Sequence, residues 1–314
     1  MSQTLTIAII QASPAYLDLT KSLEKMEQYI KDAAKQGAAL IVFGETWLCG
    51  YPSWLDHCPN IALWDHEPTK DVFLKMLRSG VAVPSKTTEL IGKWAKQYGL
   101  TIMVGVNEVV PKGKGNGTIY NSLLLFDPNG HLVNHHRKLM PTYTEKMLYG
   151  HGDGQGLKTV DTGFGEIGGL ICWEHWMPLS RQALHNEKEV IHVAVWPCVF
   201  ERHQIASRHY AFEGRCFVIA AGQILRVKDL PKELTLPEHL KNKPEHFLLN
   251  GGSCVIAPDG NYILAPQFDV EDILICEIKD LDQAYKERMT LDVTGHYQRL
   301  DVFDFEVKKT NYRN

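Results

Sequence analysis

The chain has 314 residues, of which 44% are hydrophobic and 22% are charged, a balance typical of globular proteins and not of disordered or fibrous ones. The 33 basic and 37 acidic side chains give a formal net charge of −4, so no nucleic acid or anionic membrane partner is expected. No apolar run approaches the ~20 residues of a membrane-spanning helix, and the N-terminus lacks the basic stretch of a signal peptide.

The seven cysteines are odd in number and scattered along the chain. None belongs to a CxxC pair or to a cysteine–histidine cluster with zinc spacing, so neither a disulfide framework nor a metal site is predicted. Reduced thiols of this kind are typical of a cytoplasmic protein.

Strand-like and helix-like segments alternate from the N-terminus onward. Residues 5–12 (LTIAIIQA) predict a strand, and residues 19–37 predict a helix, because apolar side chains recur there at helical spacing. The short apolar run 39–45 (ALIVFGE) predicts a second strand. Residues 87–99 and 100–106 repeat the pattern of an amphipathic helix followed by a strand.

The second half of the chain adds hairpins to this pattern. The turn sequence Asp127-Pro128-Asn129-Gly130 separates two predicted strands within residues 121–139. Further predicted strands are 165–172, 190–196, 216–224, 251–258 and 272–278, and further predicted helices are 203–214 and 280–289. No Pro/Gly/Ser-rich linker interrupts the chain, so the sequence predicts one α/β domain. The glycine-rich segments 112–117 and 150–156 lack the Lys-Ser/Thr of a phosphate-binding loop and are interpreted as loops.

Cys172 stands where a predicted strand ends, at the start of the sequence CWEHWMP. A free cysteine is most often a packed thiol. The carboxyl ends of strands, however, are where α/β sheets bind ligands, and a helix starting near Pro178 is expected to favour the thiolate.

Two further ionisable side chains follow predicted strands. Glu45 ends the run ALIVFGE, and Lys138 follows the strand that ends in HHR, with Glu145 seven residues later. Each alone is ordinarily a solvated charge. A carboxylate, an ammonium and a thiol that all fall at strand ends are expected to converge on one edge, where they suit nucleophilic catalysis. Burial there should raise the pKa of Glu45 and make it a base.

Three long motifs carry a family resemblance, VFGETWLCGYP (42–52), HRKLMPTYTEKMLYGHGDG (136–154) and GGLICWEHWMPLSR (168–181). They resemble the motifs of the nitrilase superfamily of carbon–nitrogen hydrolases, and within it the nitrilase branch; shorter matches extend the likeness over nearly the whole chain. The resemblance implies Glu45 as base, Lys138 as cation, Glu145 as its support and Cys172 as nucleophile. It also implies that Tyr51, Trp173, Trp196 and Pro197 line the pocket of an apolar nitrile.

The same resemblance implies a four-layer αββα sandwich formed by residues 1–314 as a single domain, with roughly the last 20 residues as an assembly tail. It implies a homo-oligomer, either a dimer or a larger spiral assembly, and no metal or organic cofactor. The expected reaction converts a nitrile to a carboxylic acid and ammonia through a thioimidate and an acyl-enzyme. The chain departs from common family patterns at Gly44, Tyr149, His151 and His175, which leaves the preferred nitrile open.

Alternatives remain at this point. An amidase or carbamoylase of the same superfamily would share Glu45, Lys138 and Cys172, and a cyanide hydratase-like enzyme would release an amide. A non-catalytic assembly protein and a redox-active thiol protein are interpretations from other classes, although no second cysteine lies near Cys172 in the sequence.

Overall fold

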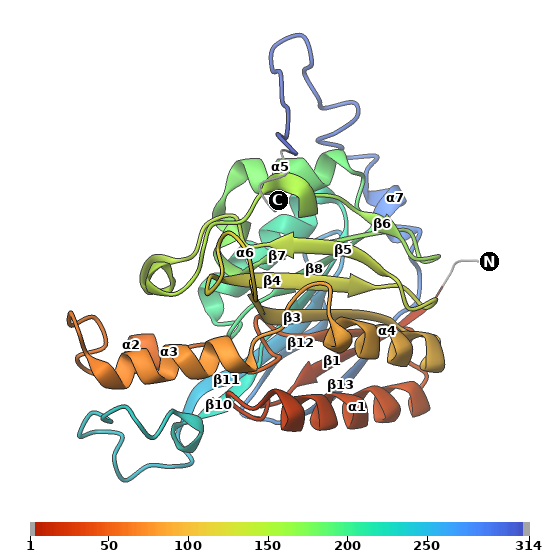
Figure 1. The fold of residues 1–314 in the computed structure, drawn as a ribbon. Coiled ribbons are helices and arrows are strands. Elements are labelled where there is room, and N and C mark those ends of the chain that lie inside the picture. The colour runs from red at the N-terminus through yellow and green to blue at the C-terminus, as the bar shows by residue number, and fades with distance from the viewer. Residues whose placement is uncertain (1–3, 310–314) are drawn as a thin grey trace.

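The computed structural model describes residues 4–309 and contains two β-sheets that pack face to face (Figure 1). The first sheet has the order β13-β1-β2-β3-β4-β5, with β1 to β3 parallel and the other neighbours antiparallel. Its strands are β1 (Leu5–Gln11), β2 (Leu40–Phe43), β3 (Thr101–Val109), β4 (Ile119–Phe126), β5 (Leu132–Arg137) and β13 (Asp272–Ile278).

The second sheet has the order β10-β11-β9-β8-β7-β6, and β12 pairs with β11. Its parallel centre is formed by β7, β8 and β9. The strands are β6 (Val160–Asp161), β7 (Glu166–Ile171), β8 (Ile191–Val195), β9 (Phe217–Ala221), β10 (Ile224–Arg226), β11 (Phe247–Ile256) and β12 (Tyr262–Phe268).

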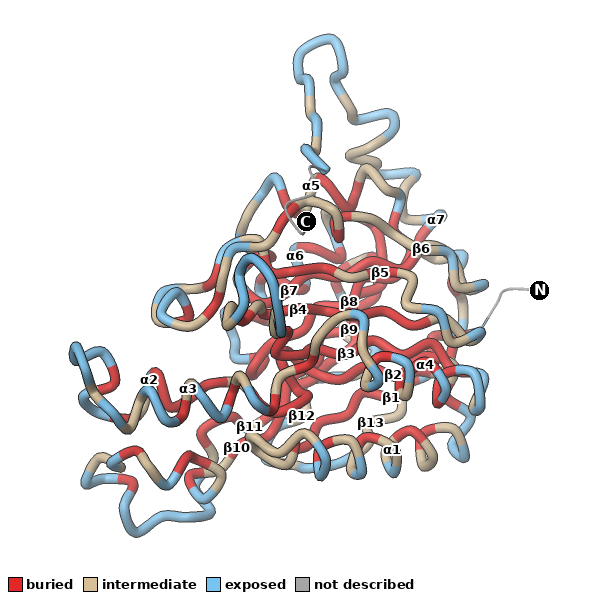
Figure 2. The backbone as a smooth tube through the Cα atoms, viewed as in Figure 1, coloured by how far each residue is buried: buried red, intermediate tan, exposed pale blue. Residues whose placement is uncertain are grey.

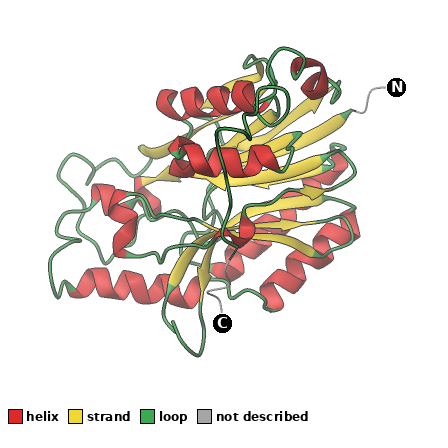
Figure 3. Ribbon diagram, turned by 90° about the horizontal axis from the view of Figure 1, so that it is seen from above, coloured by secondary structure: helices red, strands yellow, loops and turns green. Residues whose placement is uncertain are grey.

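Helices cover the outer face of each sheet, so the fold has the expected four layers (Figure 3). On the first sheet lie α1 (Leu19–Lys35) and α4 (Lys86–Tyr98); on the second lie α5 (Pro178–Asn186) and α6 (Glu201–Gly214). The N-terminus of α4 is closed by a capping box between Ser85 and Thr88, and Gly99 ends the helix in the left-handed region. The sequence predicted the main helices and the hairpin turn at 127–130.

The alternation of side chains along β1 explains the layering. Ile7 and Ile9 point toward the second sheet, whereas Ala8 and Ile10 pack against α1 and α4. All four side chains are fully buried, and a buried isoleucine contributes about 1.5–3 kcal/mol relative to an exposed one. Because both faces of this sheet are hydrophobic, each face has to be covered by another layer of the fold.

Several segments leave this body. The short helix α2 (Trp54–His57) and the longer helix α3 (Glu67–Ser79), neither of which the sequence predicted, project to one side together with residues 227–246 (Figure 1). After α7 (Gln283–Glu287) the chain forms an irregular arm, largely exposed in Figure 2, on which Leu300 and Phe303 are 75% and 70% exposed. Single-domain organisation with an assembly tail stays a prediction, and residues 310–314 of that tail lie outside the described residues. Across residues 4–309, no helix is both long and apolar enough to span a bilayer.

Candidate active site

Glu45 lies in a tight turn directly after β2 and is fully buried. The amide of Gln223, from the second sheet, donates a hydrogen bond to the Glu45 carbonyl oxygen at 2.6 Å. Asn121, on β4, donates to Glu45 Oε1 at 2.7 Å. Asn121 therefore holds the carboxylate of Glu45, and Gln223, between β9 and β10, holds its backbone.

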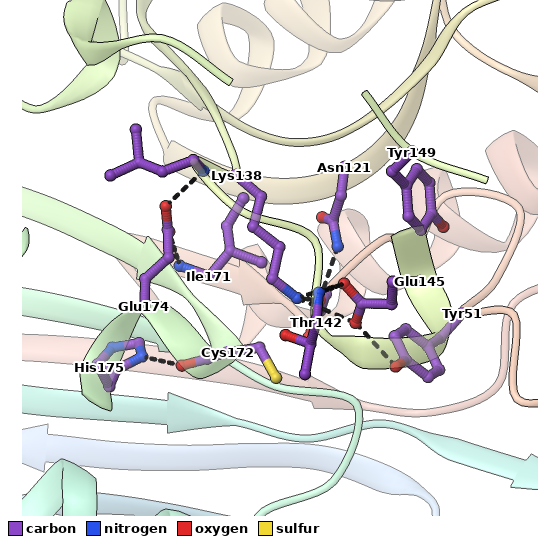
Figure 4. Close-up of polar contacts among 12 residues, drawn as sticks. Tyr51, Asn121, Lys138, Thr142, Glu145, Tyr149, Ile171, Cys172, Glu174 and His175 are labelled. Carbon is purple, nitrogen blue, oxygen red and sulfur yellow. Dashed lines mark hydrogen bonds and ion pairs between the residues drawn. The ribbon is translucent and has the colours of Figure 1, made fainter. Parts of the chain in front are cut away.

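Lys138 follows β5, and its backbone N–H still pairs with the carbonyl of Asn121 at 2.8 Å. Its fully buried ammonium group donates to Glu45 Oε1 at 2.9 Å. It also donates to Glu145 Oε2 at 2.7 Å (Figure 4). Glu145 lies in the 3-10 turn η1 (Tyr143–Met147), where it accepts a hydrogen bond from the Thr142 N–H and another from the Tyr51 hydroxyl at 2.9 Å. One cation thus bridges two buried carboxylates.

Cys172 follows β7 directly and begins the 3-10 turn η3 (Cys172–Trp176) with φ +50°, a left-handed conformation that is uncommon for a residue with a Cβ. Such a conformation is held only when its surroundings stabilise it. Here Glu174 accepts hydrogen bonds from the N–H of Ile171 at 2.7 Å and of Leu139 at 2.8 Å. These bonds join the residue before Cys172 to the residue after Lys138.

The electrostatics of the cluster follow from burial and mutual charge. Burial raises the pKa of Glu45 to about 7, with Lys138 opposing and Glu145 adding to the shift. Burial alone would lower the pKa of Lys138, but the surrounding Glu45, Cys172 and Glu145 raise it well above its ordinary value. Lys138 is therefore charged at neutral pH, and Glu45 can exchange a proton there.

The expectation of a stabilised Cys172 thiolate is wrong. Burial, together with the nearby Glu45 carboxylate, raises the pKa of Cys172 well above its ordinary value, despite the opposing charge of Lys138. The helix near Pro178 does not reverse this, because η3 intervenes between Cys172 and α5. The resting sulfur is a thiol. Glu45 Oε2 is buried and makes no hydrogen bond to another group within residues 4–309, so it is available to take the thiol proton.

The structure thus brings Glu45, Lys138, Glu145 and Cys172 together, as the sequence predicted, but not along one sheet edge. The carboxylate and the ammonium follow strands of the first sheet, and the thiol follows a strand of the second. The cluster forms only where the two sheets meet.

A cavity of about 550 Å³ opens above Cys172, a size typical of small-molecule sites. Tyr51, Trp173 and Pro197 line it, as predicted, together with Phe200 and other residues. Trp196 lies behind this wall: it is fully buried and stacks between His175 and His203, with ring centroids 4.7 and 4.6 Å away. Within residues 4–309, no group of three or more histidine, cysteine, aspartate or glutamate side chains could hold a metal ion.

Sequence reasoning missed three polar residues of this site, namely Asn121, Glu174 and Gln223. A signal was present for two of them, because Asn121 interrupts the apolar strand YNSLLLF and Glu174 follows the nucleophile inside a largely aromatic run. Buried polar groups need hydrogen-bond partners, so a polar residue in an apolar run indicates a specific hydrogen bond. Gln223 gave no comparable signal.

Comparison with known proteins places this architecture in a family. The family model described as carbon–nitrogen hydrolase matches residues 6–287, and the chain belongs to this family. An aliphatic nitrilase of Sinorhizobium fredii is 36% identical over 96% of this chain and 94% of its own length. An arylacetonitrilase of Trametes versicolor is 32% identical over 98% of both chains. The fold matches Nit3 of Saccharomyces cerevisiae with a TM-score of 0.71 and 20% identity, over 95% of this chain and 98% of that chain.

Proposed function

We propose that this protein is a nitrilase that hydrolyses an organic nitrile to a carboxylic acid and ammonia. The observation that carries the proposal is the buried contact of Lys138 with Glu45 and Glu145 beside the Cys172 thiol, at the floor of a cavity. Full-length relatives at 36% and 32% identity are named as nitrilases, which supports nitriles as the substrate class.

In the first half of the reaction, Glu45 takes the proton of Cys172 as the sulfur attacks the nitrile carbon. The carbon–sulfur bond forms as one carbon–nitrogen π bond breaks, and the negative charge that develops on the nitrogen lies near the Lys138 ammonium. The proton then passes from Glu45 to this nitrogen, which gives the neutral thioimidate. Preorganised stabilisation of this kind contributes about 3–4 kcal/mol per donor. Because the ammonium is already held by Glu145, little reorganisation is needed when the charge appears.

In the second half, a water molecule adds to the thioimidate carbon and ammonia leaves, which gives a thioester on Cys172. A second water molecule, deprotonated by Glu45, cleaves the thioester and releases the carboxylic acid and the free thiol. Two waters are consumed per nitrile, so all atoms are accounted for. Glu145 holds Lys138 in position throughout.

The substrate side chain is proposed to contact Tyr51, Trp173 and Pro197, whose aromatic and apolar surface suits an uncharged R group. Trp196 contributes by supporting this wall from behind. The proposal makes hydrophobic nitriles better substrates than charged ones.

The decisive test is an ammonia-release screen over a library of nitriles and the matching amides. Wild-type protein should release ammonia from at least one nitrile, and Cys172→Ala should abolish this release. Cys254→Ala, which removes another buried thiol that does not line the cavity, should retain it. Turnover of amides alone would identify an amidase, and an amide as the main product of nitriles would identify a hydratase. Unchanged ammonia release by Cys172→Ala would refute the mechanism.

We also propose that the subunits assemble into a homo-oligomer in the cytoplasm. Leu300 and Phe303 on the C-terminal arm, and Leu179 on α5, expose large apolar surfaces that an assembly would bury. The seven cysteines are all free, which suits a reducing compartment. Light scattering should give a mass above that of one chain, and the double variant Leu300→Ser/Phe303→Ser should lower it.

A further inference from the structure

Behind the nucleophile turn lies a second buried polar cluster that the proposed reaction does not use. It is a linear chain of hydrogen bonds that starts at the Cys172 carbonyl oxygen. His175 Nδ1 lies 2.7 Å from this oxygen, and His175 Nε2 lies 2.9 Å from His192 Nε2. His192 Nδ1 in turn lies 2.8 Å from Glu189 Oε1, and the Tyr210 hydroxyl donates to Glu189 Oε2 at 2.5 Å.

The direction of every bond in this chain follows from its first member. A carbonyl oxygen can only accept, so His175 Nδ1 carries a proton, and in a neutral ring its Nε2 is then an acceptor. His192 Nε2 must therefore donate, which leaves His192 Nδ1 as an acceptor in a neutral ring. The last bond to Glu189 then needs a proton that a carboxylate does not have.

The hydrogen-bonded chain therefore contains one extra proton, beyond those present when Glu189 is ionised and both imidazoles are neutral. That proton lies on Glu189 as a carboxylic acid, or on His192 or His175 as an imidazolium. If it is lost, two lone pairs face each other at 2.8 or 2.9 Å, and one contact of the chain has to break.

The burial of the cluster favours retention of this proton near neutral pH. Burial raises the pKa of Glu189 to about 7, against the opposing influence of His185. Burial lowers the pKa of both His175 and His192 well below the ordinary value. Gly168 on β7 makes room for the carboxyl group, because a Cβ there would lie 2.1 Å from Glu189 Oε1.

Other ionisable groups face the cluster from the elements packed around it. From α5 come Arg181, which donates to the His175 carbonyl, and His185, which contacts Glu213 of α6. Arg288 donates to the Glu189 carbonyl, the Cys216 thiol lies close by, and Glu174 acts on both imidazoles from η3. Within residues 4–309, none of these side chains is hydrogen-bonded to the carboxyl oxygens of Glu189.

We propose that Glu189 is a positioning residue that acts through His192 and His175 to hold the left-handed turn of Cys172, and that loss of the shared proton releases this turn. The role in turnover rests on the proposed hydrolytic function, whereas the shared proton does not. Glu45 must be ionised and the cluster must be protonated, so activity should fall on the acid side through Glu45 and on the alkaline side through the cluster.

Glu189→Gln tests the proposal, because an amide N–H can donate to His192 while the amide oxygen accepts from Tyr210. The bond directions then persist without a titrating proton. Wild-type kcat should fall as the pH rises above neutrality, and Glu189→Gln should keep the acid-side fall but lose the alkaline one. Glu213 is a neighbouring carboxylate that does not belong to this hydrogen-bonded cluster. Glu213→Gln should therefore retain the alkaline fall of kcat. An alkaline fall that is identical in wild type and Glu189→Gln overturns the proposal.

A second readout does not depend on any substrate. The raised pKa of Glu189 makes the folded state bind more protons than the unfolded state between about pH 4.5 and about pH 7, so this group's stabilisation declines as the pH rises through that window. Glu189→Gln should remove this part of the slope of stability against pH, and no change in slope refutes the shared proton even if nitriles are not the substrate. If Glu189→Gln does not fold, the pH dependence of kcat in His175→Asn tests the proposal instead. Its amide can donate to the Cys172 carbonyl without His192, so it too should lose the alkaline fall, and a retained fall overturns the proposal.

Discussion

The side-chain amide of Asn121 lies 2.7 Å from Glu45 Oε1, and both side chains are buried. This hydrogen bond favours the ionised carboxylate and thereby lowers the pKa of Glu45. Ionised Glu45 is the form that accepts the thiol proton, so kcat/KM should decline as the pH falls through about 7. Asn121→Ala removes a bond to a charged group, worth about 1.5–3 kcal/mol, and should move this decline about 1–2 pH units higher.

Asn107 provides the matched control, because it pairs directly with Asn121 across β3 and β4 and is also buried. Its side chain instead contacts the Gly50 carbonyl and the Tyr149 hydroxyl. Asn107→Ala should destabilise the fold but leave the acid-side decline of kcat/KM where it is. If both variants shift the pH profile equally, the contact with Glu45 is not the cause.

Lys138→Met should be the most destabilising single change at the site. It leaves two buried carboxylates without their cation, and breaking a buried pair in this way costs about 3–5 kcal/mol. The loss should be smaller below about pH 7, since Glu45 then becomes neutral. Chemical denaturation at two pH values measures both effects. Lys70→Met, which removes an exposed lysine paired with Asp65 and Glu67, should barely change the denaturation midpoint.

Glu174→Gln should reduce turnover although this side chain does not line the cavity. Both carboxylate oxygens accept a backbone N–H, one from Ile171 and one from Leu139, and an amide can replace only one of these acceptors. The unpaired N–H costs about 1–3 kcal/mol of folding free energy. A displacement of about 1 Å between Cys172 and Lys138 should lower kcat about 100-fold with little change in KM.

Glu108→Gln controls for the loss of a buried carboxylate in general. Glu108 is equally buried, but its partners are Ser122, His135 and Arg137, none of which lines the cavity. The variant should lose stability and keep kcat per folded molecule. An equal fall in kcat for both variants would show that Glu174 has no specific role in positioning.

Gly105→Ala should disturb Glu45 from a distance of 60 residues along the chain. An added Cβ would lie 2.3 Å from the Gly44 carbonyl oxygen and 2.4 Å from the Thr46 N–H, so the turn that carries Glu45 has to move. Gly44→Ala, adjacent to Glu45, meets its nearest neighbour at 3.4 Å and should be tolerated. In steady-state kinetics, Gly105→Ala should therefore lower kcat more than Gly44→Ala does, although Gly44 is adjacent to Glu45 in the sequence.

The fold could be predicted largely from periodicity. Strands such as β7 and β8 are short apolar runs, and α1 and α4 carry apolar stripes that match their buried faces. The helix α3 escaped prediction although its apolar residues Val72 and Met76 are also spaced at i and i+4. It packs on a third hydrophobic cluster, separate from the two main cores of the sandwich.

Candidate catalytic residues could be predicted because each follows a strand, but their partners could not. Asn121 comes from the first sheet and Gln223 from a connection in the second sheet. Their contacts with Glu45 therefore depend on how the two sheets dock, which the sequence pattern does not encode. The raised pKa of Cys172 likewise depends on Glu45, which lies 127 positions earlier in the chain. The family resemblance implied that Trp196 lines the cavity, yet its ring stacks between those of His175 and His203 behind the cavity wall.

Because the first sheet supplies the proton acceptor and the cation while the second supplies the sulfur, neither half of the molecule carries a competent reaction centre by itself. Cys172 therefore gains its proton acceptor, and with it the ability to attack a substrate, only when the two sheets dock.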